Sequence, residues 1–206
     1  MDTQDKDMVS AEKEANKSES DAAMAEDKKQ KAVFLDRDGT INEDFGYVCQ
    51  LEDLKFLPNV VAGLKLLQAR GYKLIIITNQ SGIARGYYSI DDYHKLTSHM
   101  LKTLKEEGVR IDDIYYCPHG PEERCSCRKP SPKMVIDAAE KHNIKLEESF
   151  FVGDKEADIR TGKAAGCKTI MVLTGQGKNG LGDADHDADD LLDAARWIID
   201  EDAYRS

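Results

Sequence analysis

The chain has 206 residues, enough for one ordinary domain with a sizeable hydrophobic core. Its net charge of −10 argues against a nucleic-acid backbone or an anionic membrane as the main partner, although a local site can still bind a small anion. No run of about 18 apolar residues predicts a membrane span and no apolar signal core opens the chain, while five cysteines, an odd number, favour a reducing cytoplasmic setting.

Residues 1–30 differ in composition from the rest of the chain. They contain almost no large apolar side chains, and they carry nine acidic and five basic residues. Such a segment cannot bury enough apolar surface to offset the entropy lost on ordering. We therefore predict a disordered acidic tail over 1–30, followed by a single domain over 31–206.

From Lys31 onward, short apolar runs alternate with amphipathic segments. The apolar runs predict buried strands at 32–35, 73–78, 111–117, 149–154 and 168–173. The segments between them predict helices: one capped by Asn59 and running to Arg70, one opened by a Ser89–Asp92 capping box and running to Glu107, one from Pro132 to Asn143, and one from Lys155 to Ala165. A Gly-rich loop, a polar segment around His186 predicted as a solvated loop, and a last helix near 189–200 complete the chain. This alternation is typical of an α/β protein with a parallel sheet and helices on both faces.

Acidic and hydroxyl side chains follow three of the predicted strands. Asp36, Asp38 and Thr40 come directly after the first strand, Thr78 ends the second, and Asp154 ends the fourth. In open parallel sheets the functional site lies at the carboxyl ends of the strands. Several carboxylates at one edge suit Mg²⁺, and a further carboxylate oxygen could attack a phosphoryl group while cations neutralise its charge. Asp158, one turn into a helix, could either belong to this site or cap that helix.

The segment CPHGPEERCSCRKP, residues 117–130, contains four metal-ligand residues in the pattern C-x-H-x5-C-x-C. A Cys₃His set fills a tetrahedral Zn²⁺ site and leaves no position for a reacting water, so a zinc ion here would be structural. The alternative is a reduced, metal-free loop, because closing a disulfide between cysteines two residues apart strains its geometry. The predicted zinc ligands are Cys117, His119, Cys125 and Cys127.

Four motifs in this order resemble the signature of the haloacid dehalogenase (HAD) superfamily: D-x-D-x-T, a Thr after the second strand, a Lys ahead of a helix, and G-D-x-x-x-D. The resemblance implies a Rossmann-like fold, a Mg²⁺ cofactor and an aspartyl-phosphate intermediate. It makes Asp36 the nucleophile, Asp38 the general acid/base, and Thr78 and Lys129 ligands of the phosphoryl group. It assigns Mg²⁺ to Asp36, Asp154 and the main-chain carbonyl of Asp38. The segments between the motifs are short, so we predict a capless domain.

The cysteine loop is similar to that of the heptose bisphosphate and histidinol-phosphate phosphatases within this superfamily. The segments NEDFGYV (42–48) and TNQSGIARGYYS (78–89) resemble the heptose family, whereas the short gap between His119 and Cys125 also occurs among histidinol phosphatases. The heptose resemblance implies substrate contacts from Asp44, Phe45, Gly46, Tyr47, Asn79, Gln80, Ser81, Arg128 and Lys155, in addition to Thr78.

This resemblance implies a Mg²⁺-dependent phosphatase that removes the C7 phosphate of D-glycero-D-manno-heptose 1,7-bisphosphate, in the synthesis of ADP- or GDP-heptose precursors of lipopolysaccharide or surface glycans. Histidinol-phosphate hydrolysis is the alternative. A zinc-clamped binding module without turnover is disfavoured, because no catalytic part of the motif set is missing. The expected partner is a small sugar phosphate, with no nucleic acid and no membrane, and we expect a monomer.

Overall fold

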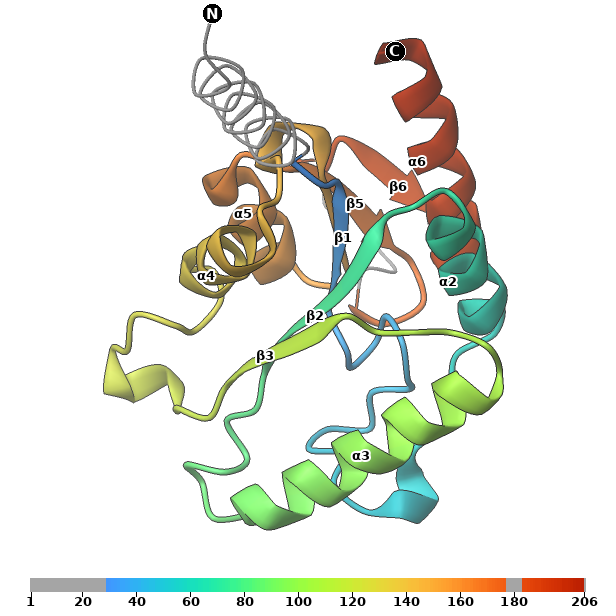
Figure 1. The fold of residues 1–206 in the computed structure, drawn as a ribbon. Helices are drawn as coiled ribbons and strands as arrows, with labels where there is room; N and C mark the ends of the chain where they lie inside the picture. The colour runs from blue at the N-terminus through green and yellow to red at the C-terminus, as the bar shows by residue number, and fades with distance from the viewer. Residues whose placement is uncertain (1–28, 177–182, 206) are drawn as a thin grey trace, which may run out of the picture.

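Six parallel strands form a single sheet in the computed structural model, which describes residues 29–176 and 183–205 (Figure 1). The strands are β1 Ala32–Leu35, β2 Lys73–Asn79, β3 Asp113–Cys117, β4 Phe150–Gly153, β5 Lys168–Val172 and β6 His186–Ala188. The helices are α2 Val60–Ala69, α3 Ile90–Glu106, α4 Lys133–His142, α5 Glu156–Ala165 and α6 Leu191–Arg205, with short 3-10 turns η1 Leu51–Asp53, η2 Pro121–Glu123 and η3 Leu146–Glu148. The sheet order is β3-β2-β1-β4-β5-β6. The predicted α/β class with a parallel sheet is confirmed.

Two hydrophobic clusters cover the two faces of the sheet, because successive strand residues point to opposite sides. Val33 and Leu35 of β1 pack with residues of α2, α3 and α6, whereas Ala32 and Phe34 pack with residues of α4. Figure 1 shows α2 and α6 on one side of the sheet and α4 and α5 on the other. Burial on both faces explains why the central strands are apolar without alternation.

The five predicted strands are present: the first has its predicted bounds, and the ends of the other four differ by one or two residues, but β6 was missed. The prediction of a solvated loop around His186 was wrong, because His186 to Ala188 pair with Ile170 to Val172 of β5. In β6 only Ala188 is buried. His186 is half-buried and Asp187 is exposed, so this short edge strand has no run of apolar residues that would mark it in the sequence.

Two predicted helix caps had different outcomes. The Ser89–Asp92 capping box at the start of α3 is confirmed, with each side chain bonded to the backbone N–H of the other. Asn59 does not cap α2: its φ is 63°, and its side chain donates instead to Asp190 Oδ2 at 2.6 Å. This bond from the Asn59 amide to a carboxylate is charge-assisted, and it ties the start of α2 to the segment that leads into α6.

The predictions for the N-terminal tail and the Gly-rich loop can be compared with the structure only in part. Residues 1–28 of the predicted tail and 177–182 of the Gly-rich loop lie outside the described residues. Gln30, placed in the tail by the prediction, is instead hydrogen-bonded to the domain: its N–H donates to Asn143 O at 2.8 Å and its carbonyl accepts from Lys145 N at 2.9 Å. Among the described residues, no helix combines the length and apolarity that crossing a bilayer requires.

The sheet order places the carboxyl ends of β2, β1 and β4 side by side, and the predicted motifs lie there. Only loops, η1 and α2 stand between β1 and β2, and only α3 and its flanking loops between β2 and β3, so these connections of the described chain hold no separate cap domain. The site is therefore covered by short loops alone.

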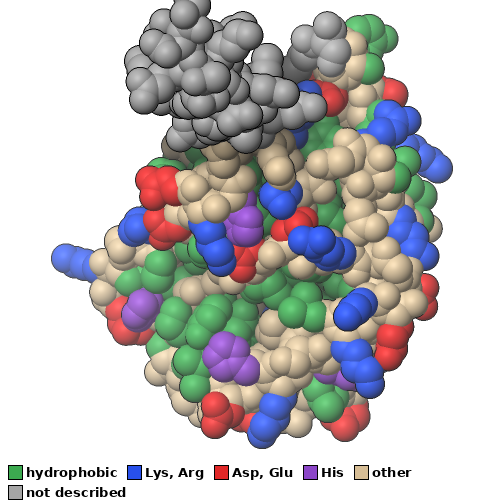
Figure 2. All heavy atoms as spheres, in the orientation of Figure 1, with side chains coloured by type: hydrophobic (Ala, Val, Ile, Leu, Met, Phe, Trp, Pro, Cys, Tyr) green, Lys and Arg blue, Asp and Glu red, His purple; other side chains and the backbone are tan. Residues whose placement is uncertain are grey.

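On the face shown in Figure 2, Lys and Arg side chains are interspersed with Asp and Glu side chains.

Candidate active site

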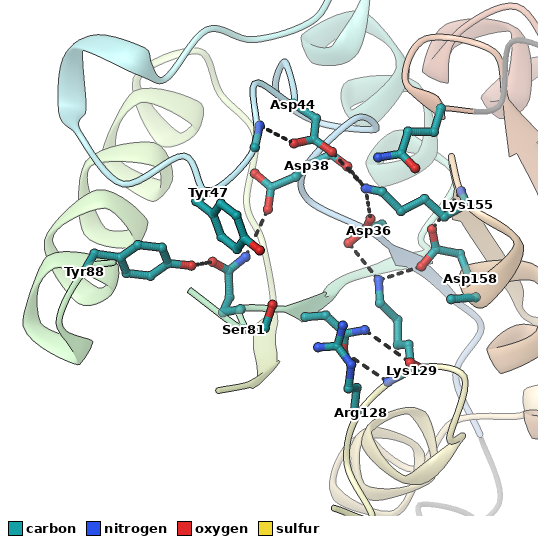
Figure 3. A pocket seen from close by; sticks show the side chains of 15 residues that line it. Asp36, Asp38, Asp44, Tyr47, Ser81, Tyr88, Arg128, Lys129, Lys155 and Asp158 are labelled. Atoms are coloured by element: carbon teal, nitrogen blue, oxygen red, sulfur yellow. Dashed lines mark hydrogen bonds and ion pairs between the residues drawn. The ribbon is translucent and has the colours of Figure 1, made fainter. Parts of the chain in front are cut away.

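A polar cavity of about 460 Å³ opens at the carboxyl ends of β1, β2 and β4 (Figure 3). The predicted residues that line it are Asp36, Asp38, Asp44, Gly46, Tyr47, Asn79, Gln80, Ser81, Arg128, Lys129 and Lys155. Four more lining residues had no predicted site role or an open one: Tyr88, Ala157, Asp158 and Gln176. Of the residues predicted to act in catalysis, substrate binding or Mg²⁺ binding, three are absent from the lining: Thr78 and Asp154, which are buried, and Phe45, which is 63% exposed. The fold thus brings nearly the whole predicted set to one cavity.

Asp36 lies at the floor of this cavity, directly after β1. Its backbone N–H donates to Val152 O at 2.9 Å, which fixes the residue against β4. Its Oδ1 accepts from Arg37 N at 2.8 Å and lies 2.7 Å from Lys129 Nζ. Burial alone would raise the pKa of Asp36, but the charges of Lys129 and Lys155 outweigh it and lower that pKa below the usual range. Asp36 is therefore an ionised carboxylate, as a nucleophile must be.

Lys129 is a buried ammonium shared by two carboxylates. Its Nζ lies 2.7 Å from Asp36 and 2.6 Å from Asp158, and it donates to Ile77 O at 2.8 Å. Its main chain is held from both sides by Asn79, whose Oδ1 accepts from Lys129 N at 3.0 Å and whose Nδ2 donates to Lys129 O at 3.2 Å. Burial favours the neutral amine, but the two carboxylates raise the pKa of Lys129, so it stays charged.

Asp158 has both roles that its sequence position left open. One carboxylate oxygen accepts from the backbone N–H of Lys155 at 3.1 Å and caps α5, while the other lies 2.6 Å from Lys129 Nζ. Burial, followed by the negative charge of Asp36, raises the pKa of Asp158 to about 7. Gly153 makes this close packing possible, because a Cβ there would lie 2.3 Å from Asp158 Cβ.

The three oxygen ligands predicted for Mg²⁺, from Asp36, Asp154 and the Asp38 carbonyl, all lie near the ammonium of Lys155. Its Nζ lies 3.0 Å from the Asp38 carbonyl oxygen, 3.2 Å from Asp154 Oδ1, 3.8 Å from Asp36 Oδ2 and 3.1 Å from Asp44 Oδ2. Burial, followed by the charge of Asp36, raises the pKa of Asp154 to about 6. Two carboxylates and a carbonyl are the hard oxygen donors that suit Mg²⁺, so the residues present fit this ion.

Asp38 is held by a set of donors that sequence reasoning did not anticipate. The buried Arg37 donates to Asp38 Oδ1 through Nε at 3.0 Å and Nη2 at 2.7 Å, and Nη2 also reaches Oδ2 at 2.8 Å. Asn42 Nδ2 adds a bond to Oδ1 at 3.0 Å, and Gln80 Nε2 a bond to Oδ2 at 3.0 Å. A charged residue between the two aspartates of D-R-D was the available signal, because a buried arginine requires a carboxylate partner.

The loops at the mouth of the cavity carry exposed aromatic rings. Tyr47 adopts a φ of 58°, uncommon for a bulky residue, and its ring meets that of Tyr87 edge-on at 4.6 Å between centroids. Asp44 Oδ1 accepts from Gly46 N at 2.9 Å, which shapes the same loop. Arg128 donates from Nη1 to His119 O at 3.2 Å, so its guanidinium is tied to the cysteine loop.

The four predicted zinc ligands form a tight cluster. Cys127 Sγ lies 3.1 Å from Cys117 Sγ and 3.6 Å from Cys125 Sγ, and His119 Nδ1 lies 3.3 Å from Cys127 Sγ and 3.5 Å from Cys117 Sγ. These edges are close to the roughly 3.5–3.8 Å that a tetrahedron with Zn–S of about 2.3 Å requires. The four residues could therefore hold one ion. Cys167 packs in the same hydrophobic cluster as Cys117 but is not one of these four ligand-type residues.

Comparisons with known proteins agree with this geometry. A family model described as HAD-hydrolase-like matches residues 126–196. The chain is 51% identical over 145 residues to a D-glycero-beta-D-manno-heptose-1,7-bisphosphate 7-phosphatase of Helicobacter pylori, covering 70% of this chain and 83% of that protein. It is 43% identical over 177 residues to the protein of the same name from Haemophilus influenzae, covering 82% and 96%. A solved D,D-heptose 1,7-bisphosphate phosphatase from B. bronchiseptica, complexed with magnesium and phosphate, superposes with a TM-score of 0.78 at 32% identity, covering 84% of this chain and 99% of that one.

Proposed function

Because this chain belongs to the HAD-like family of the heptose-1,7-bisphosphate 7-phosphatases, and is thereby a phosphoric monoester hydrolase, we propose that it removes the C7 phosphate of D-glycero-D-manno-heptose 1,7-bisphosphate. The observation that carries the proposal is the ionised Asp36 at the floor of a polar cavity, with Lys129 on one side and Lys155 on the other. A phosphate dianion can approach a buried carboxylate that lies between two fixed cations, because the positive charges offset the repulsion between the two anions.

The reaction is a double displacement at phosphorus. A carboxylate oxygen of Asp36 forms a bond to the C7 phosphoryl phosphorus, and the bond from phosphorus to the sugar oxygen breaks. Asp38 protonates the departing alkoxide, then takes a proton from water, which attacks the aspartyl-phosphate and releases inorganic phosphate. The attack restores the Asp36 carboxylate. Lys129, together with the Thr78 hydroxyl, binds the phosphoryl oxygens throughout.

Magnesium is the proposed cofactor of this site. Asp36, Asp154 and the main-chain carbonyl of Asp38 would hold it, since their oxygens face one point beside the cavity. When bound, Mg²⁺ neutralises negative charge on the phosphoryl group and on the carboxylates that surround it. Asp154 is fixed for this task by the backbone N–H of Gln176, which donates to its Oδ2 at 2.9 Å.

Zinc is the proposed occupant of the cysteine cluster, with a structural role. The cluster ends at Cys127, directly before Arg128 and Lys129, so a closed tetrahedral site would hold the segment that delivers both cations. Arg128 would contact the distal C1 phosphate by a bidentate interaction, and Asp44 would accept from sugar hydroxyls. The free cysteines suit a cytoplasmic enzyme. We further propose that the enzyme is a monomer, and that its product, heptose 1-phosphate, is used in the synthesis of surface-glycan precursors.

A substrate panel with one nucleophile variant tests the proposal. We expect both anomers of the heptose 1,7-bisphosphate to be hydrolysed with a higher kcat/KM than fructose 1,6-bisphosphate or histidinol phosphate. Asp36→Asn should reduce the rate by at least about 1,000-fold, as the loss of a covalent nucleophile does elsewhere. Asp53→Asn, an exposed residue of η1, is the matched control and should leave the rate unchanged. Preferential hydrolysis of histidinol phosphate, or full activity of Asp36→Asn, would overturn the assignment.

A further inference from the structure

Gln80 occupies a position between two groups of the proposed reaction. It follows β2 directly, is 2% exposed, and its backbone N–H donates to Cys117 O at 2.7 Å. Its side-chain Nε2 donates to Asp38 Oδ2 at 3.0 Å and to Thr78 Oγ1 at 2.8 Å. A primary amide has two hydrogens on this nitrogen, and both are used. One side chain therefore contacts the proposed acid/base and the proposed phosphoryl-binding hydroxyl together.

Tyr88 holds the other end of this amide. Its hydroxyl donates to Gln80 Oε1 at 2.7 Å, and the residue is 8% exposed. The ring is fixed by close packing on Gly82, where a Cβ would lie 2.2 Å from Tyr88 Cε1. The dashed line that leaves Tyr88 in Figure 3 marks this contact. The tyrosine comes from the loop between β2 and α3, so tertiary packing alone brings it here.

The bond from Tyr88 controls which way the amide faces. Without that hydroxyl, Gln80 Oε1 would be a buried carbonyl oxygen lacking its donor, which is unfavourable. Thr78 carries the hydroxyl within reach of the same amide, and turning the amide would let it donate to Oε1. The turned amide would point an oxygen, not an N–H, toward Asp38 Oδ2, which accepts from Gln80 Nε2 in this structure. Both useful contacts of Nε2 would be lost together.

The direction of the Thr78 proton follows from the same network. Thr78 Oγ1 accepts from Gln80 Nε2, so its own O–H points away from Gln80 and is free to donate. A donating hydroxyl is what a phosphoryl oxygen requires. In the turned state this proton would be directed to Gln80 Oε1, and the hydroxyl would face substrate as an acceptor.

We infer that Tyr88 is a positioning residue, which through Gln80 holds Asp38 and the Thr78 hydroxyl in the orientations that the phosphoryl transfer uses. This inference rests on the proposed function, because Asp38 and Thr78 have their roles there. Tyr88 acts without contacting the reacting atoms, so its removal should change kcat and not KM.

A double-mutant cycle on kcat and KM tests the inference with Tyr88→Phe, Gln80→Leu and the double variant. We expect Tyr88→Phe to lower kcat about tenfold, in line with one buried hydrogen bond, with KM changed less than about twofold. The double variant should be no slower than Gln80→Leu alone, because Tyr88 then has nothing left to position. Tyr72→Phe, a buried tyrosine that packs on Phe150, is the matched control and should retain parent kinetics.

Two results would overturn the inference. One is an additive cycle, in which Tyr88→Phe costs the same factor with leucine at position 80, as it would if Tyr88 contacted substrate directly. The other is a change confined to KM.

A second readout separates this inference from the proposed function. The side-chain amide protons of Gln80, followed by ¹⁵N NMR, should shift and exchange faster in Tyr88→Phe and stay unchanged in Tyr72→Phe. An unshifted Gln80 amide in Tyr88→Phe refutes the positioning role. If the parent hydrolyses p-nitrophenyl phosphate but no heptose bisphosphate, the substrate assignment fails, while the same cycle run on p-nitrophenyl phosphate still decides the role of Tyr88.

Discussion

Replacing Lys129 by methionine removes an ammonium that two buried carboxylates share. The side chains of Lys129 and Asp158 are 3% and 1% exposed, so water cannot take over the role of the cation. Asp36 would keep the Arg37 N–H at 2.8 Å and Lys155 at 3.8 Å. Asp158 would keep only the N–H of Lys155, which caps α5. The variant thus leaves Asp158 as the poorly compensated charge.

The size of the effect follows from this burial. Removing one partner of a buried ion pair destabilises proteins by about 3–5 kcal/mol, because the remaining charge stays desolvated. Asp158 can escape this cost by taking up a proton. Its pKa is already raised to about 7 with Lys129 present, first by burial and then by Asp36, and it must rise further when the ammonium is gone.

The stability loss therefore depends on pH, with a defined sign. A carboxyl group whose pKa is higher in the folded state than in the unfolded state binds a proton on folding, so the free energy of unfolding falls as pH rises between the two pKa values. In Lys129→Met this window extends above pH 7. Each pH unit within it changes the free energy of unfolding by about 1.4 kcal/mol, with the variant most destabilised at high pH.

Urea unfolding at pH 6 and pH 9 measures this difference. Lys129→Met/Asp158→Asn should recover most of the stability at pH 9 while remaining inactive, because the buried charge is gone but the phosphate ligand is still missing. Lys133→Met, which removes an exposed lysine of α4, should change the free energy of unfolding by less than about 1 kcal/mol at either pH. If Lys129→Met loses the same stability at both pH values, or the double variant is not rescued, the assignment of Asp158 as the stranded charge is wrong.

Three further predictions concern the metal sites. Cys127→Ser should lower zinc affinity by at least about 100-fold and reduce activity, because the segment that carries Arg128 becomes disordered. The control variant Cys167→Ser should keep its zinc. Metal analysis that shows one full equivalent of zinc in Cys127→Ser would contradict this prediction. Mg²⁺ affinity should fall about tenfold per pH unit below pH 6, because a proton competes for Asp154, whose pKa is raised to about 6 by burial and then by Asp36; calorimetry that finds equal affinity at pH 5 and pH 7 would refute it. Gly175→Ala should weaken Mg²⁺ binding by roughly tenfold or more, since its Cβ would lie 2.0 Å from Asp154 Oδ2, and unchanged affinity by calorimetry would count against Asp154 as a ligand.

The class of the fold and the location of the cavity follow from the sequence alone. Buried parallel strands are apolar along their length, and the acidic motifs interrupt that pattern where each strand ends, as at Asp36 and Asp154. The capping box at Ser89 was equally accessible, because its two bonds join residues three apart. These features depend on residues that are close together in the chain, so they can be predicted from the sequence.

Contacts between segments that lie far apart in sequence arise only when the chain folds. Asn59 is an ordinary N-cap by local rules, yet it bonds to Asp190, 131 positions later. The polar strand β6 pairs with the edge of β5, which no local pattern in its own sequence indicates.

The orientation of the catalytic groups has the same origin. The Lys155 ammonium contacts the carbonyl of Asp38, which lies 117 positions away in the sequence, and Gln80 contacts Asp38 from 42 positions away. Both contacts arise because the order of strands in the sheet brings these segments together. Residue types and local spacing specify which groups a site contains. Their partners, burial and pKa values arise from packing, because a hydrogen bond or a buried charge depends on what the folded chain places beside it.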